Sequence, residues 1–138
     1  MEKKVVDLRS ALELLREMPG QLIETDVPVE PMAELSGVYR HVGAGGTVMR
    51  PTKEGPAMIF NNIKGHPDAR VAIGVMASRK RVAALFGCKP EEVGKMLYKS
   101  VDNPIPPVLV KDAPLCQQVV HKAEDPDFDL FKLVPAPT

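Results

Sequence analysis

Apolar residues recur at helical spacing near the start of the chain. Leu8, Leu12 and Leu15 lie three or four residues apart, which predicts a first helix with one apolar face. Asp7 is suited to cap this helix because its carboxylate can accept hydrogen bonds from first-turn amides. Pro19-Gly20 then predicts its end.

A second helix is predicted to begin at Pro31, since proline fits the first helical turn. Its expected apolar face consists of Met32, Leu35, Tyr39 and Val42. The glycine-rich stretch 43–46 is expected to end the helix as a flexible connector.

Two further helices are predicted between residues 78 and 100. Ser78 can cap the third, which ends at Gly87 and carries Val82, Leu85 and Phe86. Pro90 opens the fourth, followed by two glutamates that favour the positive end of the helix dipole. The residues expected to face inward from it are Val93, Met96 and Leu97.

Short apolar runs between these helices predict strands at residues 21–24, 57–60 and 71–76. The run at 57–60 is continuous, as in a strand buried on both faces. The predicted class is therefore α/β, with α+β as the alternative, and a small mixed sheet flanked by about four helices.

The pattern changes after Ser100. Pro104, Pro106 and Pro107 force an extended segment because each fixes its own φ and disfavours helix before it. A strand at 108–110, a turn or short helical start at 125–130 and a linker at 134–138 are the expected elements beyond. We therefore divide the chain into an α/β domain, residues 1–103, and a proline-rich extension, residues 104–138.

Composition narrows the classes of function. The 138 residues are 44% hydrophobic and carry 18 basic and 18 acidic side chains, which argues against a general electrostatic grip on nucleic acid or membranes. No apolar run reaches the roughly 18 residues of a membrane helix. With no signal-peptide pattern and only two cysteines, we expect a cytoplasmic protein.

No group of residues forms a convincing catalytic or metal-binding pattern. Glycines 43, 45 and 46 lack the lysine and preceding strand of a phosphate-binding loop. Asp125, Asp127 and Asp129 lack the glycine and glutamate of a calcium loop, so turns and caps are the simpler interpretation. The three histidines and Cys88 have no partner at a suitable spacing.

Three arginines remain as candidates for contacts with another domain or subunit. Arg79 and Arg81 lie in the first turn of the third predicted helix, where cations oppose the dipole. Either the local geometry differs there or acidic side chains from elsewhere pair with them, and a solvated charged face is the simpler alternative. Arg50 follows the glycine cluster and is the third candidate. We predict no catalytic, cofactor-binding or metal-binding residue within the chain.

Several motifs in order resemble the N-terminal part of the UbiD-like decarboxylases. They are Gly55 to Gly65 (GPAMIFNNIKG), the basic helix Arg79 to Gly87, the proline-rich segment from Pro104, Cys116-Gln117, Asp125 to Leu130 and Leu133 to Pro137. Residues 24–26 and 33–47 further resemble the hydroxybenzoate branch, which acts on protocatechuate, 4-hydroxybenzoate, vanillate or gallate.

This resemblance implies reversible, non-oxidative loss of CO2 from a phenolic acid. It also implies prenylated FMN with a divalent metal, typically manganese, and potassium as cofactors of the intact enzyme. The family's metal ligands, cofactor-binding arginine and catalytic glutamates lie in a following flavin-binding domain. We therefore expect the 138-residue chain alone to be inactive, and to bind the rest of the decarboxylase chain within a homo-oligomer.

Two alternatives stay open. In the first, the chain is a stand-alone assembly or binding module, or a decayed subunit, without activity of its own. In the second, it is an enzyme complete within 138 residues, which would need a catalytic group of residues that the sequence does not display. If the extension packs on a neighbouring domain, its apolar side chains form an exposed patch in the chain by itself. The members of this expected patch are Val108, Leu109, Val110, Phe128, Phe131 and Leu133.

Overall fold

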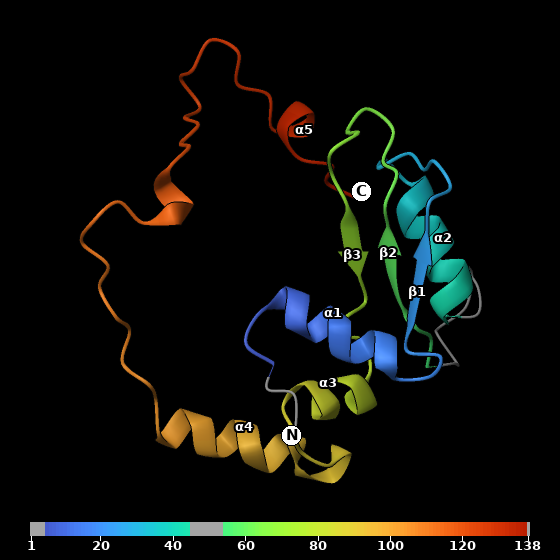
Figure 1. Ribbon diagram of the computed structural model, residues 1–138, viewed down its shortest axis with the longest axis vertical. Helices are drawn as coiled ribbons and strands as arrows, with labels where there is room; N and C mark the ends of the chain where they lie inside the picture. Colours follow the sequence, from blue (N-terminus) through green and yellow to red (C-terminus); the bar gives the residue numbers. More distant parts are fainter. Residues whose placement is uncertain (1–4, 45–53, 138) are drawn as a thin grey trace.

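A three-stranded mixed sheet organises the protein. The computed structural model describes residues 5–44 and 54–137, and its strands are β1 (Leu22–Thr25), β2 (Ala57–Phe60) and β3 (Val71–Ile73). β2 lies in the middle, parallel to β1 and antiparallel to β3 (Figure 1). The predicted α/β class with a small mixed sheet is confirmed.

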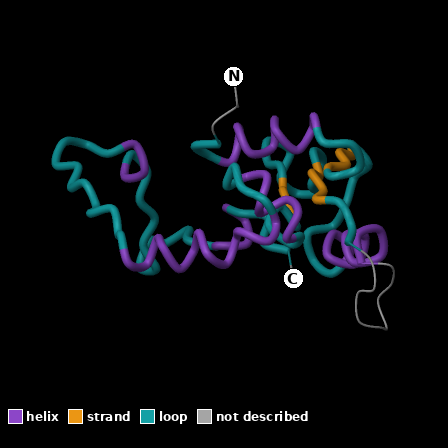
Figure 2. Tube along the Cα trace, turned by 90° about the horizontal axis from the view of Figure 1, so that it is seen from below, coloured by secondary structure: helices purple, strands orange, loops and turns teal. Residues whose placement is uncertain are grey.

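Helices cover both faces of this sheet. α1 (Leu8–Glu17) contacts β1 and α3 (Arg79–Leu85), while α2 (Glu34–Ala44) packs on β2 from the opposite side (Figures 1 and 2). A 3₁₀ turn, Pro90–Glu92, leads into α4 (Val93–Asp102). A second 3₁₀ turn, Leu115–Gln117, and the short α5 (Leu130–Leu133) lie in the C-terminal extension.

The first helix has the predicted cap and end. The Oδ1 atom of Asp7 accepts a 2.8 Å hydrogen bond from the Ser10 amide, and Ser10 Oγ accepts one from the Asp7 amide. Gly20 follows the helix with φ of +72°, a conformation that glycine adopts without steric cost. β1 then begins one residue later than predicted.

The main core lies between α2 and the sheet. β2 is buried along its whole length, because alternate side chains point to the two covered faces. Burial of each large apolar side chain here contributes about 2 kcal/mol. The buried members of the cluster are Val29, Leu35, Met58, Phe60 and Ile63, with Tyr39, Val71 and Ile73 packed against them.

The start of α2 differs from the prediction. Pro31 lies in a turn, and the helix begins only at Glu34, because Ala33 has φ of +62° and interrupts any helical path. On the predicted apolar face Leu35 and Tyr39 do pack inward, whereas Met32 and Val42 are exposed. The helix continues to Ala44, so the predicted connector begins later, and Gly45 and Gly46 lie outside the described residues.

β3 is shorter than the predicted strand 71–76. It ends at Ile73, since Gly74 takes φ of +73° and turns the chain toward α3. The predicted cap of α3 is confirmed: Ser78 Oγ accepts a hydrogen bond from the Arg81 amide. Gly87, with φ of +66°, follows its end as predicted.

The inward face predicted for the fourth helix is largely wrong. Val93 is buried, but Met96 and Leu97 are 38% and 50% exposed. The physical reason is tertiary: α4 contacts α3 and the preceding 3₁₀ turn near its start, and the rest of the helix extends past them (Figure 1). An amphipathic pattern identifies the apolar face of a helix but not the surface that covers it. The described residues cover only the start of the apolar face of α4.

Residues 103–129 form a long extended arm that lies away from the folded body, and α5 lies back near the β2–β3 turn (Figures 1 and 2). The possible strand at 108–110 is not formed, because none of the described strands lies beside this segment to pair with it. The predicted helical start near 130 is confirmed as α5, capped by Asp129, which accepts from the Phe131 and Lys132 amides. Within the described ranges, no helix is long and apolar enough to cross a membrane.

Candidate functional site

Arg81 is an enclosed charged side chain that joins four segments of the fold. It is 1% exposed. Its Nη1 donates to the carbonyl of Gly55 at 2.7 Å and to the side-chain oxygen of Gln21 at 3.2 Å. Its Nη2 donates to the Gly74 carbonyl at 3.0 Å, and Nε donates to the Val75 carbonyl at 3.3 Å. The planar guanidinium suits this task because it presents several N–H donors in fixed directions.

The charge of Arg81 is stabilised mainly by backbone carbonyl groups and the Gln21 amide oxygen, and not by a direct carboxylate partner. Burial lowers the pKa of this guanidinium, and the nearby Tyr39 and Glu54 oppose part of that effect. Arginine nonetheless stays protonated. Glu54 itself accepts a hydrogen bond from Ser78 Oγ, so the acid is tied to the cap of the helix that carries Arg81. The arrangement fixes the positions of the backbone segments that Arg81 contacts.

Close backbone packing surrounds this arginine. A Cβ atom on Gly74 would overlap the Tyr39 ring and hydroxyl, and a Cβ on Gly55 would overlap the Gly43 backbone. Both glycines are therefore required by space, and Gly74 also by its positive φ. Arg81 bonds to the carbonyls of these same two glycines.

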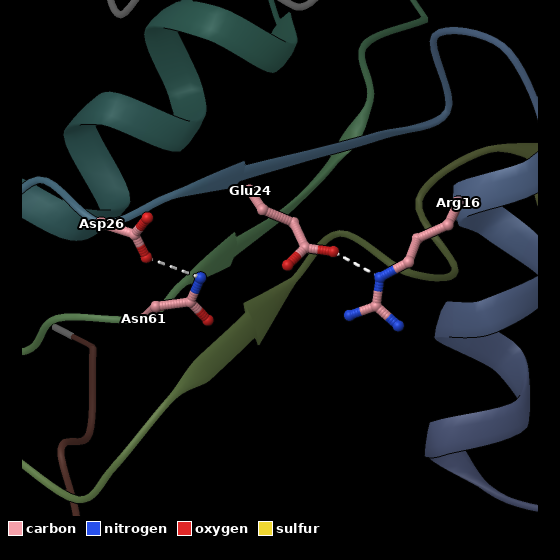
Figure 3. A network of polar contacts seen from close by, with 4 residues as sticks. All are labelled: Arg16, Glu24, Asp26 and Asn61. Atoms are coloured by element: carbon pink, nitrogen blue, oxygen red, sulfur yellow. Dashed lines mark hydrogen bonds and ion pairs between the residues drawn. The ribbon is translucent and has the colours of Figure 1, made fainter.

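A second set of polar contacts follows β1 (Figure 3). Arg16 of α1 pairs with Glu24 of β1 at 2.5 Å. Beyond the ends of β1 and β2, Asn61 Nδ2 donates to an Asp26 carboxylate oxygen at 3.1 Å. The neighbouring Asn62 donates to the Asp26 carbonyl at 3.2 Å. These contacts hold the carboxyl ends of the two parallel strands in register.

The structure separates the three predicted contact residues. Arg79 is exposed on the first turn of α3, Arg81 is directed into the fold, and Arg50 lies outside the described residues. Glu54 is the acidic side chain near Arg81, and it acts on the Arg81 guanidinium by its charge rather than by a direct contact. Contacts of the three arginines with another domain or subunit stay a prediction.

Sequence patterns alone missed Gln21, Gly55 and Gly74 as partners of Arg81. One signal was available: Ser78, Arg81 and Leu85 lie at i, i+3 and i+7, the spacing of one helix face. An arginine on the same helix face as the cap and the half-buried Leu85 is placed to point inward. Its carbonyl partners carry no such signal, because every residue has a carbonyl group.

The remaining sequence candidates are not brought together. Asp125 accepts from the Lys122 amide at 2.8 Å in a turn and Asp129 caps α5, which confirms the turn and cap interpretation. In residues 5–44 and 54–137, no three His, Cys, Asp or Glu side chains lie close enough to hold a metal ion. The donor set of this part of the chain thus does not fit a metal or metal-bound cofactor.

Apolar side chains are exposed along the extension. Every member of the patch expected from the sequence is exposed, and Ile105 reaches 93%. Met96 and Leu97 of α4 are exposed as well. Exposed apolar side chains of this kind are typical of surfaces that contact another protein.

Comparison with known proteins gives the relationships of the chain. Residues 12–101 match the family described as the 3-octaprenyl-4-hydroxybenzoate carboxy-lyase N-terminal domain. The whole chain is 53% identical to a gallate decarboxylase of Lactiplantibacillus plantarum, and it spans 28% of that protein's length.

Solved structures resemble the chain over nearly its full length. A 3,4-dihydroxybenzoic acid decarboxylase from Enterobacter cloacae is 55% identical, with a TM-score of 0.80 over 96% of this chain and 27% of that one. The UbiD-class enzyme HmfF from Pelotomaculum thermopropionicum is 24% identical, with a TM-score of 0.74 over 95% of this chain and 27% of its own. The latter likeness concerns the fold.

Proposed function

The chain belongs to the 3-octaprenyl-4-hydroxybenzoate carboxy-lyase N-terminal domain family, and from this membership we propose that it is the N-terminal domain of a phenolic acid decarboxylase. The reaction proposed for the intact enzyme is the reversible, non-oxidative loss of CO2 from a hydroxybenzoic acid. The observation that carries the proposal is 53% identity with a gallate decarboxylase along the whole chain. The similarity to a 3,4-dihydroxybenzoic acid decarboxylase supports the same substrate class.

The chemistry is assigned to residues outside this chain. The chain spans little more than a quarter of the decarboxylases that it matches. Prenylated FMN is the proposed cofactor, supported by the HmfF structure solved with prFMN. Manganese and potassium are proposed beside it on the family resemblance alone. The described residues include no group of metal-ligating side chains, so we assign them no step of the reaction.

The part proposed for this chain is scaffolding and assembly. The extension and the exposed end of α4 would pack against the flavin-binding part of the decarboxylase chain, where their apolar side chains are removed from water. A boundary near residue 103 is supported by the end of α4 at Asp102. We also propose a cytoplasmic homo-oligomer, for which the dimeric form of HmfF is a precedent.

Among the three arginines, Arg79 is proposed to contact the partner domain or subunit directly. Arg81 would act indirectly: its hydrogen bonds fix the turn before α3, and this turn sets the position of Arg79. Arg50 keeps its proposed contact role on sequence grounds alone.

The test begins with the source gene read past the codon for Thr138. A frame that continues into a flavin-binding domain identifies the protein to assay. That protein, loaded with prenylated FMN, is expected to release CO2 from gallate or 3,4-dihydroxybenzoate, while the 138-residue chain with the same cofactor is expected to release none. Failure of the longer protein on gallate, protocatechuate, vanillate and 4-hydroxybenzoate would overturn the proposal.

A further inference from the structure

β1 is an outer strand of the sheet, and none of the described strands pairs with the edge that faces away from β2 (Figure 1). The carbonyl groups of Gln21 and Thr25 accept hydrogen bonds from the β2 side, at 2.9 and 3.0 Å. Since alternate residues of a parallel strand bond to the same neighbour, Leu22 and Glu24 direct their amide and carbonyl groups to the open edge. Within residues 5–44 and 54–137, none of these outward groups has a backbone partner.

The open edge of β1 carries none of the features that usually keep edge strands apart. Proline, lysine and β-bulges are common at such edges, whereas β1 consists of Leu-Ile-Glu-Thr in unbroken register with β2. Its only charged side chain, Glu24, is directed to α1, where it pairs with Arg16 (Figure 3). The backbone of this edge is therefore available to another strand.

An apolar groove of about 450 Å³ lies beside this edge, between β1 and α2. The two glutamates at the groove are both in ion pairs, Glu24 with Arg16 and Glu34 with Lys64. A second copy of this face therefore adds apolar surface without bringing unpaired like charges together. The aliphatic side chains at its rim, between 36% and 68% exposed, are Ile23, Val27, Val38 and Val42.

We infer that β1 pairs with β1 of a second copy of this chain, antiparallel about a two-fold axis. With Leu22 opposite Glu24 of the second copy, all outward groups form hydrogen bonds and Ile23 meets its own equivalent at the axis. Two other symmetric registers are poorer. Glu24 opposite itself would bring like charges together, and Leu22 opposite itself would align Glu24 with Gly20, which lies outside the strand with φ of +72°.

The position of the C-terminal extension favours a second copy over the same chain as the partner. Residues 103–129 lie on the opposite side of the folded body from β1 and α2 (Figures 1 and 2). The pairing deepens the proposed homo-oligomer, on which it rests, by naming a surface for it. Because the test below uses the chain without cofactor or substrate, its failure leaves the proposed decarboxylation standing.

The small size of this surface sets the strength expected of the dimer. Two short strands and a few aliphatic side chains per copy fall within the weak, transient class of interface, below about 1,200 Å² in total. We therefore expect a Kd on the order of 100 μM for the 138-residue chain. In a longer protein, contacts elsewhere would raise the effective concentration of the two edges and strengthen the pairing.

Sedimentation velocity over a concentration series tests the dimer. Ile23→Lys is expected to weaken it at least about tenfold, because the two lysines would lie opposite each other with Cβ atoms about 5 Å apart. Val101→Lys is the matched control, an exposed valine on α4, and should leave Kd unchanged. A chain that stays monomeric up to about 1 mM would overturn the inference. So would a control variant that dissociates as readily as Ile23→Lys.

A milder variant covers the case in which lysine disturbs the fold. Ile23→Thr keeps the β-branched shape that suits a strand and removes apolar surface, so it should weaken the dimer several-fold with little change in Tm. An unchanged Kd in this variant, together with an unchanged Kd in a folded Ile23→Lys, would exclude β1 as the contact.

Amide hydrogen exchange shows whether the contact is strand pairing. The Leu22 and Glu24 amides should exchange several-fold more slowly in the dimer than in dilute solution, whereas the Ile23 and Thr25 amides, which face β2, should change little. A dimer in which Leu22 and Glu24 exchange as fast as in the monomer would contradict the pairing. Protection of both amides in a longer protein that is monomeric would also contradict it, because a segment of the same chain would then cover the edge.

Discussion

The guanidinium of Arg81 donates a 2.7 Å hydrogen bond to the carbonyl oxygen of Gly55, which lies 26 residues earlier in the chain. Through this contact α3 is attached to the segment that enters the central strand of the sheet. The same side chain reaches the carbonyls of Gly74 and Val75, so the two ends of the β2–β3 unit are held by one residue.

Replacing Arg81 with methionine is expected to lower the free energy of unfolding by about 3 kcal/mol, because several buried carbonyl groups lose their donors. Arg81→Lys should also destabilise, since an ammonium group does not reproduce the fork of donors. Urea denaturation of the full chain measures both. Arg79→Met is the control and should change stability by less than about 0.5 kcal/mol; an effect as large as that of Arg81→Met would contradict this role.

Two glycines with similar backbone angles provide a matched test of packing. Gly65 has φ of +80° with open space where a Cβ would lie, whereas a Cβ on Gly74, at +73°, meets Tyr39. Gly65→Ala should cost about 1 kcal/mol for the left-handed conformation. Gly74→Ala should cost about 2 kcal/mol more because it also displaces the ring. Equal losses in thermal unfolding would show that Tyr39 does not confine this turn.

The Arg16–Glu24 ion pair is expected to contribute less than about 1 kcal/mol, because the two side chains are 43% and 35% exposed and water screens them. A double-mutant cycle with Arg16→Gln and Glu24→Gln measures the coupling, which should shrink as salt rises toward about 1 M. The hydrogen bond that Arg16 donates to Glu24 raises the pKa of Arg16. A raised pKa gives stability that is complete at lower pH and lost only as pH rises through it, so no alkaline loss from this pair is expected below about pH 10. Coupling that persists at high salt would contradict this account.

Acid should weaken the cap of α1. Hydrogen bonds from the Ser10 hydroxyl and amide lower the pKa of Asp7 below its usual 3.8. A lowered folded-state pKa gives stability that is present above the unfolded value and lost as pH falls through the folded one. Asp7→Asn keeps a capping side chain without the charge. The Tm difference between wild type and this variant should therefore vanish as pH falls from about 7 to about 2; a constant difference would exclude the charge as its source.

The extension is expected to be dispensable for the fold of the first 103 residues. Its apolar side chains are exposed, so a stop after Asn103 removes little buried surface. The shortened chain should keep a cooperative unfolding transition and bind several-fold less hydrophobic dye than the full chain. Unfolding of the shortened chain, or unchanged dye binding, would contradict the proposed division.

Local features of the fold were predictable because they depend on neighbours in sequence. The caps at Asp7 and Ser78, the buried run at 57–60 and the stop at Gly87 each involve only a few consecutive residues. The start of α2 and the end of β3 were placed wrongly. Ala33 and Gly74 take positive φ angles there that suit the tertiary path, and no local pattern indicates them.

The sequence by itself determined the class of the fold, its main elements and, through a series of spaced motifs, its family. Helical and strand periodicity are properties of the local chain, so they can be read without knowing what packs against what. Only the tertiary structure decided that Arg81 points inward, that most of α4 lacks a partner among residues 5–44 and 54–137, and that Ile23 of β1 and Val42 of α2 line one groove. These relationships join residues far apart in the chain, and their free energy comes from contacts that exist only after the sheet and helices have assembled.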